Sequence, residues 1–540
     1  AVGYRSLSAT TTASSNTAIG VDALTSNTTG TSNTAVGRDT LNQQTTASYN
    51  TALGHQALNL NSSGANNTAS GYRALYANTT GAGNTAAGYT ALAANTTGAE
   101  NVIVGAWAGD ANTTGSYNTA LGVQALSTNT TADSNTAIGR LALYLNTTGH
   151  SNVAVGASAL QANTTAANNT AVGKDALTAN TTGSENVAVG LDALQANTTA
   201  SDNVGVGHSA LEANTTGASN VAVGKNALGA NTTAANNTAV GYSALVANTT
   251  GTQNTAVGAE ALDANTTGSY NAALGEKSLS TNILGSKSTA IGTFALFSQN
   301  PASAVDMYNT AIGYDAGNAV TTGTENTLIG GLAGDALTVG NSNVAVGTYA
   351  LSADTKGDRN VAIGRAALQV QNFTSTTDSY NTAVGYGAGE LVTTGTNNTF
   401  VGGQAGDATD DGGNNTAVGK SALSANCGDN NTAVGLEALT ACTGDSNTAL
   451  GKNAGNAVTS GDNNMFLGRD AGLTGSPGGQ QTTSSDRIGL GDEHITNCHI
   501  QVDWTVASDE RDKTDFTALD LGLDFVKALA PVTYKWDKRS

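Results

Sequence analysis

Proline, cysteine, aromatic and charged residues are all scarce in this chain of 540 residues. It contains 3 Pro and 3 Cys, and only 5 % of its residues are aromatic and 11 % charged, whereas about 25 % are charged in ordinary soluble domains. A conventional globular core needs large apolar side chains, which are too few here for a domain of this length. Collagen is excluded because the 67 glycines are far fewer than the one residue in three of a collagen chain.

The few charges are mostly acidic. The formal net charge of −19 argues against a nucleic-acid partner, because binding to phosphates needs clustered Lys and Arg. No apolar run reaches the roughly 18 residues of a membrane span, so membrane insertion is not expected. No metal or cofactor motif appears either, and no cofactor is expected. The chain begins inside a repeated motif, at Ala1-Val2-Gly3, so we expect a further part upstream.

One short repeat accounts for most of the chain. The motif N-T-A-V-G recurs, and its last glycine falls at Gly3, Gly20, Gly37 and onward to Gly292 with a constant 17-residue period. The phase slips by four residues before Gly313 and again before Gly385, and the last clear anchor is Gly468. A disordered segment has no reason to hold phase over so many intervals, whereas a coil of stacked turns does.

The order of residues within each repeat predicts a β-solenoid. In the sequence N-V-A-V-G at 152–156, strand alternation places Val153 and Val155 on one face and Asn152 and Ala154 on the other. Gly156 is the expected corner, because glycine readily takes positive φ. The Ala-Leu pair that follows predicts a second short strand, and the Asn seven residues after the glycine predicts a turn. Asn residues at equivalent positions should form ladders of amide hydrogen bonds.

The predicted fold class is therefore all-β: a parallel β-solenoid or β-roll of 17-residue turns, with a small α+β segment at the C-terminus. A helical repeat is disfavoured because helical solenoid repeats are longer, roughly 33 to 47 residues. About 28 turns spaced by about 4.8 Å give a rod on the order of 130 Å long. Both strand faces are apolar, which predicts a homotrimer, with a dimer as the alternative. In that trimer one face fills each coil and the Ala-rich face packs about the common axis.

The recurring N-T-A-V-G-x-x-A-L motif resembles the left-handed parallel β-roll of trimeric autotransporter adhesin heads of the YadA type. The resemblance covers roughly residues 1–468. It implies a trimeric, adhesive, extracellular rod. The repeat here has three more residues per turn, in the added N-T-T segment.

The end of the chain has a different composition. Residues 469–507 are expected to form a linker and a β-rich cap, and residues 508–540 to begin a second domain. The S-D-x-R-x-K pattern at 508–513, with L-D-F-V-x-x-L-x-P-V-x-Y-x-W downstream, resembles the start of the intramolecular chaperone of phage endosialidases, tail spikes and tail fibres. The resemblance implies chaperone-driven trimerisation followed by self-cleavage. It makes Ser508 the nucleophile and Lys513 its base, which is sensible because a serine hydroxyl needs a neighbouring base. An ordinary surface turn is the alternative for these two residues.

Three cysteines do not make a disulfide framework. Cys427 and Cys442 fall in two turns that are each one residue shorter than the others, and so on adjacent rungs. Free thiols are the preferred interpretation, with a disulfide as the alternative. His494 and His499 flank Cys498, but the spacing is not that of a zinc site, and no metal is expected.

The N-T-T triplets are formally N-glycosylation sequons, but we expect them to serve turn formation. An ice-binding threonine array is also disfavoured, because the hydroxyls of adjacent threonines in a turn point in different directions.

The predicted function is a structural and adhesive fibre. The leading hypothesis is the shaft of a phage tail fibre or tail spike in the virion, bound to other fibre or virion proteins upstream and to a host surface glycan or protein receptor. A bacterial cell-surface adhesin or extracellular filament subunit is the alternative. No enzyme activity is expected beyond one self-cleavage at Ser508, since the repeats offer no acidic catalytic cleft. The irregular turns near 293–312 and 365–384 are the candidate receptor site within the shaft.

Overall fold

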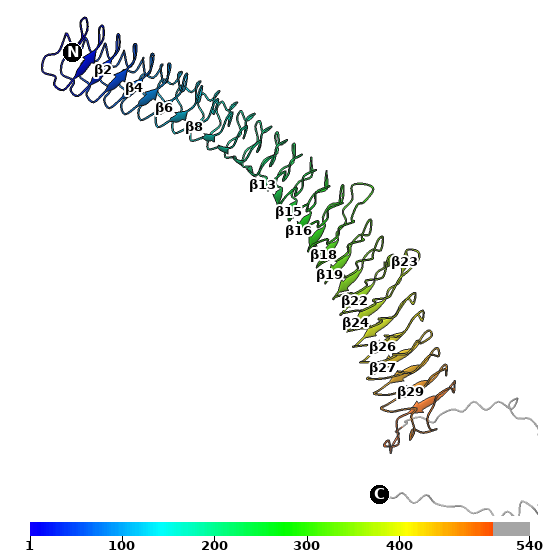
Figure 1. Ribbon diagram of the computed structural model, residues 1–540. Helices are drawn as coiled ribbons and strands as arrows, with labels where there is room; N and C mark the ends of the chain where they lie inside the picture. Colours follow the sequence, from blue (N-terminus) through cyan, green and yellow to red (C-terminus); the bar gives the residue numbers. More distant parts are fainter. Residues whose placement is uncertain (500–540) are drawn as a thin grey trace, which may run out of the picture. The chain divides into compact units, whose positions relative to one another are not determined.

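The computed structural model describes residues 1–499, which contain strands, turns and coil but no helix. Of the strands, 28 join in one parallel sheet, each pairing in register with the strand of the next turn (Figure 1). The prediction of a parallel β-solenoid with 17-residue turns is confirmed. The expected α+β segment and residues 508–540 lie outside the described residues.

The strands have the following bounds: β1 (Thr17–Ile19), β2 (Thr34–Val36), β3 (Thr51–Leu53), β4 (Thr68–Ser70), β5 (Thr85–Ala87), β6 (Val102–Val104), β7 (Thr119–Leu121), β8 (Thr136–Ile138), β9 (Val153–Val155), β10 (Thr170–Val172), β11 (Val187–Val189), β12 (Val204–Val206), β13 (Val221–Val223), β14 (Thr238–Val240), β15 (Thr255–Val257), β16 (Ala272–Leu274), β17 (Thr289–Ile291), β18 (Thr310–Ile312), β19 (Thr327–Ile329), β20 (Val344–Val346), β21 (Gly357–Asp358), β22 (Val361–Ile363), β23 (Thr377–Asp378), β24 (Thr382–Val384), β25 (Thr399–Val401), β26 (Thr416–Val418), β27 (Thr432–Val434), β28 (Thr448–Leu450), β29 (Met465–Leu467) and β30 (Ile488–Leu490). The short strands β21 and β23 pair only with each other.

The anchor glycine forms the corner after each strand, as predicted. Gly156 has a φ of 138°, a conformation that is nearly restricted to glycine. The neighbouring turn also leaves no room for a side chain, because a Cβ atom on Gly156 would lie 2.3 Å from the carbonyl oxygen of Gly173. Close stacking of the corners therefore requires a glycine in every turn.

The face that points into the coil is the alanine face. Ala154 is fully buried within a single chain, whereas Val153 and Val155 are only half-buried. The expectation that the Ala-rich face packs about a common axis is therefore wrong. So short a turn encloses little volume, and only a methyl group fits opposite the leucine that fills the lumen.

The Ala-Leu segment does not form the expected second strand. Both Ala176 and Leu177 are buried, and Asp175 and Leu177 have φ angles of 58° and 53°. Strand alternation would have sent the two side chains to opposite faces. The left-handed residues bend the segment so that both side chains point into the coil.

Two ladders of buried asparagines run along the interior and confirm the predicted amide stacking. In the first, the Asn152 backbone N–H donates to Oδ1 of Asn135 at 3.0 Å, and Asn152 Nδ2 donates to the Ala166 carbonyl at 2.9 Å. In the second, Asn163 Nδ2 donates to Oδ1 of Asn146 at 2.9 Å and to the Ala166 carbonyl at 3.0 Å. Because polar groups buried without partners are costly, these ladders fix the position of each turn on the next.

In a few turns the large interior residue stands at the strand position and the small one at the position that is usually leucine. Ile103 replaces the strand alanine in β6, and Gly109 stands where most turns have the buried leucine. A Cβ on Gly109 would lie 3.4 Å from two carbon atoms of Ile103. Phe400 and Gly406 make the same exchange, with a Cβ on Gly406 only 2.5 Å from the Phe400 ring. In these two turns the volume lost at the leucine position is regained at the strand position.

One position of the second ladder holds a carboxylate. Asp354 is fully buried; its Oδ1 accepts from the Gly357 N–H at 2.9 Å and its Oδ2 from Gln371 Nε2 at 2.7 Å. Burial raises the pKa of Asp354, and these hydrogen bonds offset only part of the effect. The folded state therefore disfavours the ionised form relative to the unfolded chain.

We expect Asp354→Asn to become progressively more favourable than the wild type as the pH rises. A folded-state pKa above the unfolded value means that wild-type stability falls as the pH rises from the unfolded to the folded pKa. The loss is about 1.4 kcal/mol for each tenfold change in the dissociation constant. Hydrogen exchange of peptides covering residues 347–364, compared between the two proteins at each pH from 4 to 7, measures the difference. An unchanged difference across this range would contradict the prediction.

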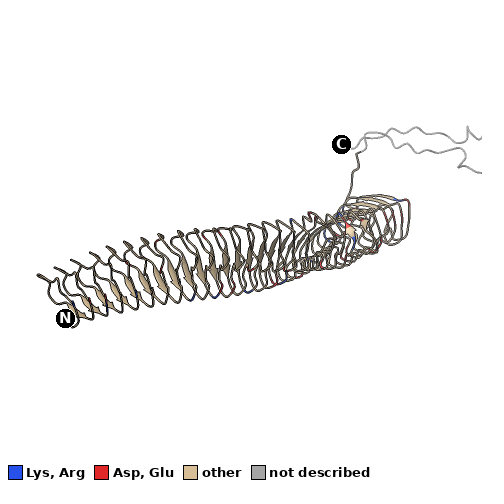
Figure 2. Cartoon of the chain, turned by 90° about the horizontal axis from the view of Figure 1, so that it is seen from above, with Lys and Arg blue, Asp and Glu red and all other residues tan. Residues whose placement is uncertain are grey.

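The outer face of the sheet carries no charge and combines a row of mainly Thr with a row of mainly apolar residues. Its residues in the three-residue strands are mainly Thr or Val and then Val, Ile or Leu, and Leu53, Leu121 and Leu274 are each about half exposed. Apart from Asp358 and Asp378 in the short strands β21 and β23, the charged residues of the described part lie on the turns between strands (Figure 2). Large contiguous apolar patches on a protein surface often mark interaction sites, so the row of Val, Ile and Leu makes this face suited to cover by another protein surface.

Residues 1–492 form one compact unit. Its last strand, β30, pairs with β29 after an interval longer than a regular turn and lies in the segment expected to hold a linker and a β-rich cap. Within the described residues, no helix is long and apolar enough to cross a membrane.

Candidate functional site

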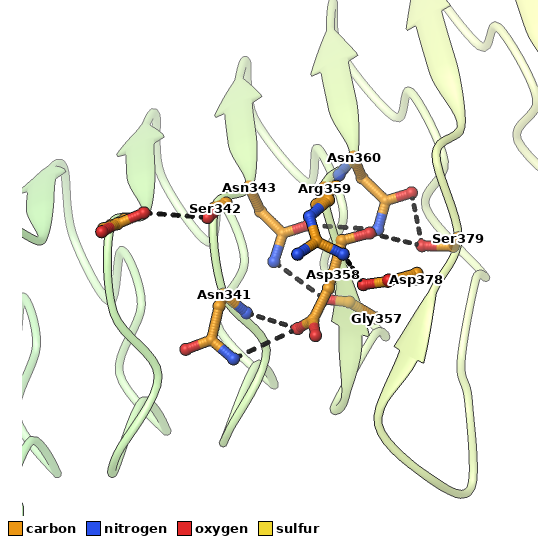
Figure 3. A network of polar contacts seen from close by, with 10 residues as sticks. Asn341, Ser342, Asn343, Gly357, Asp358, Arg359, Asn360, Asp378 and Ser379 are labelled. Atoms are coloured by element: carbon orange, nitrogen blue, oxygen red, sulfur yellow. Dashed lines mark hydrogen bonds and ion pairs between the residues drawn. The ribbon is translucent and has the colours of Figure 1, made fainter.

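The two irregular turns are the points where the uniform shaft changes. Gly292 and Gly313, and likewise Gly364 and Gly385, are separated by four residues more than the regular period. The additional residues precede β18 and β24, and the second insertion extends beyond the neighbouring turns (Figure 3).

A buried glutamine precedes each insertion in the interior of the coil. Gln299 and Gln371 occupy the place that Asn holds in most turns. Gln299 Oε1 accepts from Asn309 Nδ2 at 3.0 Å, and Gln371 Oε1 accepts from Asn381 Nδ2 at 2.8 Å. Each Gln thus links the second ladder to the first, as Gln44 does with Asn50 in a regular turn. The second ladder is then interrupted, because Val320 and Val392 hold its next positions.

The first insertion is fastened to the preceding turn by an ion pair. Lys287 Nζ lies 2.7 Å from Asp306 Oδ2 and 3.0 Å from the Tyr308 hydroxyl oxygen. The same ammonium group lies 5.1 Å from the centre of the Tyr308 ring. The hydrogen bond to Asp306 raises the pKa of Lys287 and lowers the pKa of Asp306. The three groups are exposed, so solvent weakens the pair and its main effect is to position the loop.

The second insertion repeats this arrangement. Arg359 pairs with Asp378, and the Arg359 guanidinium carbon lies 5.5 Å from the centre of the Tyr380 ring. The carboxylate of Asp378 raises the pKa of Arg359. Pairing of β21 with β23 adds backbone hydrogen bonds between the insertion and the preceding turn.

The two arrangements correspond residue by residue along the chain. Asp306, Tyr308 and Tyr314 correspond to Asp378, Tyr380 and Tyr386, within the shared pattern D-x-Y-N-T-A-[IV]-G-Y. A search for longer repeats above the 17-residue period would have found this duplication, whereas inspection of single turns misses it.

A polar network continues between the insertions (Figure 3). Ser342 Oγ donates to Glu325 Oε2 at 3.1 Å, and the Asn341 N–H donates to Asp358 Oδ1 at 2.6 Å. Ser379 Oγ donates to Asn360 Oδ1 at 2.8 Å. These contacts pass from turn to turn, and the Ser342–Glu325 contact lies exposed on the surface. The network is suited to holding a surface rather than to chemistry.

The cysteines are free thiols, as preferred from the sequence. Cys427 and Cys442 are buried and Cys498 is exposed. Burial raises the pKa of both Cys427 and Cys442 to about 11. Cys442 replaces an Asn of the second ladder and accepts a hydrogen bond from Asn447 Nδ2 at 3.3 Å. Both thiols therefore serve as interior packing.

Among residues 1–499, no group of three or more His, Cys, Asp or Glu is arranged to hold a metal ion. The asparagines of the N-T-T triplets, such as Asn163, are buried and hydrogen-bonded inside the coil. Thr164 Oγ1 donates to the Thr181 carbonyl at 3.1 Å, while Thr165 is exposed. In the folded shaft such asparagines are inaccessible to glycosylation.

The predicted cleavage residues Ser508 and Lys513 lie outside the described residues. Residues 508–540 match the family described as the chaperone of endosialidase. A comparison with the curated proteins finds no match to this chain.

These findings together define the class of protein. Residues 1–492 form a repetitive parallel β-solenoid, and residues 508–540, which follow it, match the chaperone of endosialidase. A β-solenoid followed by this chaperone fits a tail fibre or tail spike.

Proposed function

We propose that the chain is the trimeric shaft of a phage tail fibre or tail spike that attaches the virion to a host surface. The observation that carries this proposal is the match of residues 508–540 to the endosialidase chaperone directly after a β-solenoid. Three parallel shafts present equivalent surfaces together, which raises avidity for a repetitive host glycan or a protein receptor. Other fibre or virion proteins bind upstream.

The outer face of the sheet is the proposed contact between chains. It is uncharged and carries a row of Val, Ile and Leu along the shaft, and the alanine face cannot serve because it fills the coil. The chaperone resemblance supports a trimer rather than a dimer, because it implies the assembly of three chains.

The oligomer prediction concerns the mass of the intact rod. Light scattering should give about three times the 53.4 kDa of one chain, or slightly less if the C-terminal segment has been removed. Replacing Leu121 and Leu274, on the outer face, by Lys should lower the mass, because a charge in an apolar interface is costly. A wild-type mass equal to that of one chain would refute the trimer.

Self-cleavage is predicted at Ser508. Expression of the complete gene should give a shortened product, and Ser508→Ala should give only the long one, because the nucleophilic hydroxyl is gone. Lys513→Met should slow cleavage through loss of the base, and Ser485→Ala is the matched control outside the motif. A shortened product from Ser508→Ala would show that Ser508 is not the nucleophile.

Host attachment is tested by competition. Purified shaft should reduce adsorption of virions to host cells, and antibody labelling should place the chain on the tail. Labelling of a bacterial surface without virions would instead support the alternative, a cell-surface adhesin or filament subunit. Release of fragments from host polysaccharide would indicate a depolymerase.

A further inference from the structure

A shaft of near-identical turns leaves the axial alignment of neighbouring chains poorly defined in the proposed oligomer, on which this inference rests. The outer face repeats the same small set of residues in the 28 paired strands. Sliding one chain by one turn, about 4.8 Å, brings equivalent residues together and uncovers only one strand. Register is weakly specified when a surface is so uniform, so some feature must distinguish one turn from the next.

The two inserted turns carry such a feature beside the outer face. Tyr308 and Tyr314 stand before and after β18, and Tyr380 and Tyr386 before and after β24. All four side chains are more than half exposed. Within residues 1–468, no other anchor glycine has a tyrosine at both flanking positions. Exposed tyrosines beside an apolar surface are typical of protein interfaces.

Cations on the preceding turn hold three of these rings in place, those of Tyr308, Tyr380 and Tyr386. Lys287 and Arg359 contact Tyr308 and Tyr380, as described above. Arg365 Nη1 lies 3.4 Å from the Tyr386 hydroxyl oxygen, with the guanidinium carbon 5.6 Å from the ring centre. Contacts that fix a side chain before binding reduce the entropy lost on association. The inserted turns are therefore preorganised projections on an otherwise even shaft.

We propose that the inserted turns set the axial register between copies of this chain, each meeting the equivalent inserted turn of its neighbour. The two turns, anchored at Gly313 and Gly385, are four turns apart. A slip of one, two or three turns sets both insertions against regular turns. A slip of four turns superimposes one insertion on the other but leaves the remaining two unmatched. Only the aligned state matches both.

Disulfide cross-linking between two differently tagged, co-expressed full-length chains measures the register. Cys498 is replaced by Ser in both, while the buried Cys427 and Cys442 remain. One chain carries Leu274→Cys on the outer face of β16. The other carries a single cysteine at one of five outer-face positions on successive strands: Val240, Val257, Leu274, Ile291 or Ile312. The profile of cross-linking yields at the five positions shows which strand of one chain lies opposite β16 of the other.

The test variant removes both insertions. Residues 300–307 and 372–379 are each replaced by Thr-Thr-Gly-Thr, the sequence of a regular turn at 249–252. A second variant keeps the loops and replaces Tyr308 and Tyr380 by Ser and Tyr314 and Tyr386 by Thr, residue types found at these positions in other turns. Tyr49 and Tyr117, which precede strands in regular turns, are replaced by Ser as the matched control. Circular dichroism checks that each variant folds.

In the wild type and in the control, the cross-linking yield at one position should be at least tenfold higher than at the other four. In at least one of the two test variants, the cross-linking yields at neighbouring positions should lie within about twofold of one another. A sharp profile in both variants would overturn the inference and place register control elsewhere, such as in the C-terminal segment. If loop removal keeps the profile sharp but abolishes host adsorption, the loops bind the receptor instead. No cross-link at any position, with a monomeric mass, would refute the proposed trimer itself.

Discussion

Gly173→Ala should open the coil around its turn. The φ angle of 139° at Gly173 is strained for any residue with a Cβ atom, at a cost of about 1–3 kcal/mol. The added Cβ would also lie 2.2 Å from the carbonyl oxygen of Gly190, and a backbone carbonyl of the next turn cannot move without breaking the ladder. We expect the strain and the clash together to lower the local stability by about 4 kcal/mol or more, which is at the upper end for single substitutions.

Hydrogen exchange measured by mass spectrometry is the appropriate readout, because a long repeat array does not unfold as one unit. Peptides covering residues 170–191 should exchange much faster, and distant turns should not. Gly331→Ala is the matched control, since a Cβ at Gly331 meets no atom within 4 Å. Equal protection in the two variants would show that the corner glycines are not needed for stacking.

Ile103→Ala and Gly109→Leu should each destabilise the turn, and together they should restore it. Ile103→Ala leaves a cavity, at a cost of about 2–5 kcal/mol. Gly109→Leu forces a leucine into the space that Ile103 fills, at about 1–3 kcal/mol. The backbone does not oppose leucine, because Gly109 has a φ of 52° and Leu126, at the same place in the next turn, has 56°.

The double variant recreates the alanine and leucine of the regular turns. We expect its local stability to lie within about 1 kcal/mol of the wild type, so the coupling between the two sites should be several kcal/mol, above the usual range for residues in contact. Exchange rates of peptides covering residues 100–112 in all four proteins complete the cycle. Additive losses would contradict the idea that Ile103 fills the space left by the missing leucine at Gly109.

The repeat alone sufficed to predict the class of fold. A glycine at a constant 17-residue period indicated a corner of restricted conformation, and asparagine at two fixed positions indicated amide ladders, because both depend on local backbone geometry and identical neighbours. Both predictions agree with the structure at Gly156, Asn152 and Asn163. The chaperone motif was equally readable, because its short pattern of polar residues is specific.

The direction in which side chains point could not be predicted from the sequence. Strand alternation groups Val153 with Val155 but does not say which face lies inside, and both faces of β9 are apolar. The available volume decides: the leucine of the Ala-Leu segment already fills the lumen, so only Ala154 fits beneath it. The same segment was predicted as a strand because alternation is the default, whereas left-handed residues such as Asp175 and Leu177 turn both side chains inward.

The candidate site was also predicted only in part from the sequence. The four-residue slips of the period marked the irregular turns in the sequence, but the carboxylate partners of Lys287 and Arg359 lie on the next turn of the coil. Only the stacking of turns brings each cation to its Asp and Tyr. By itself the sequence determined a stacked coil with glycine corners, asparagine ladders and two interruptions, because these follow from local geometry and repetition. The tertiary structure alone decided which apolar face remains outside and which groups meet across turns, because both depend on the volume and pitch of the closed coil.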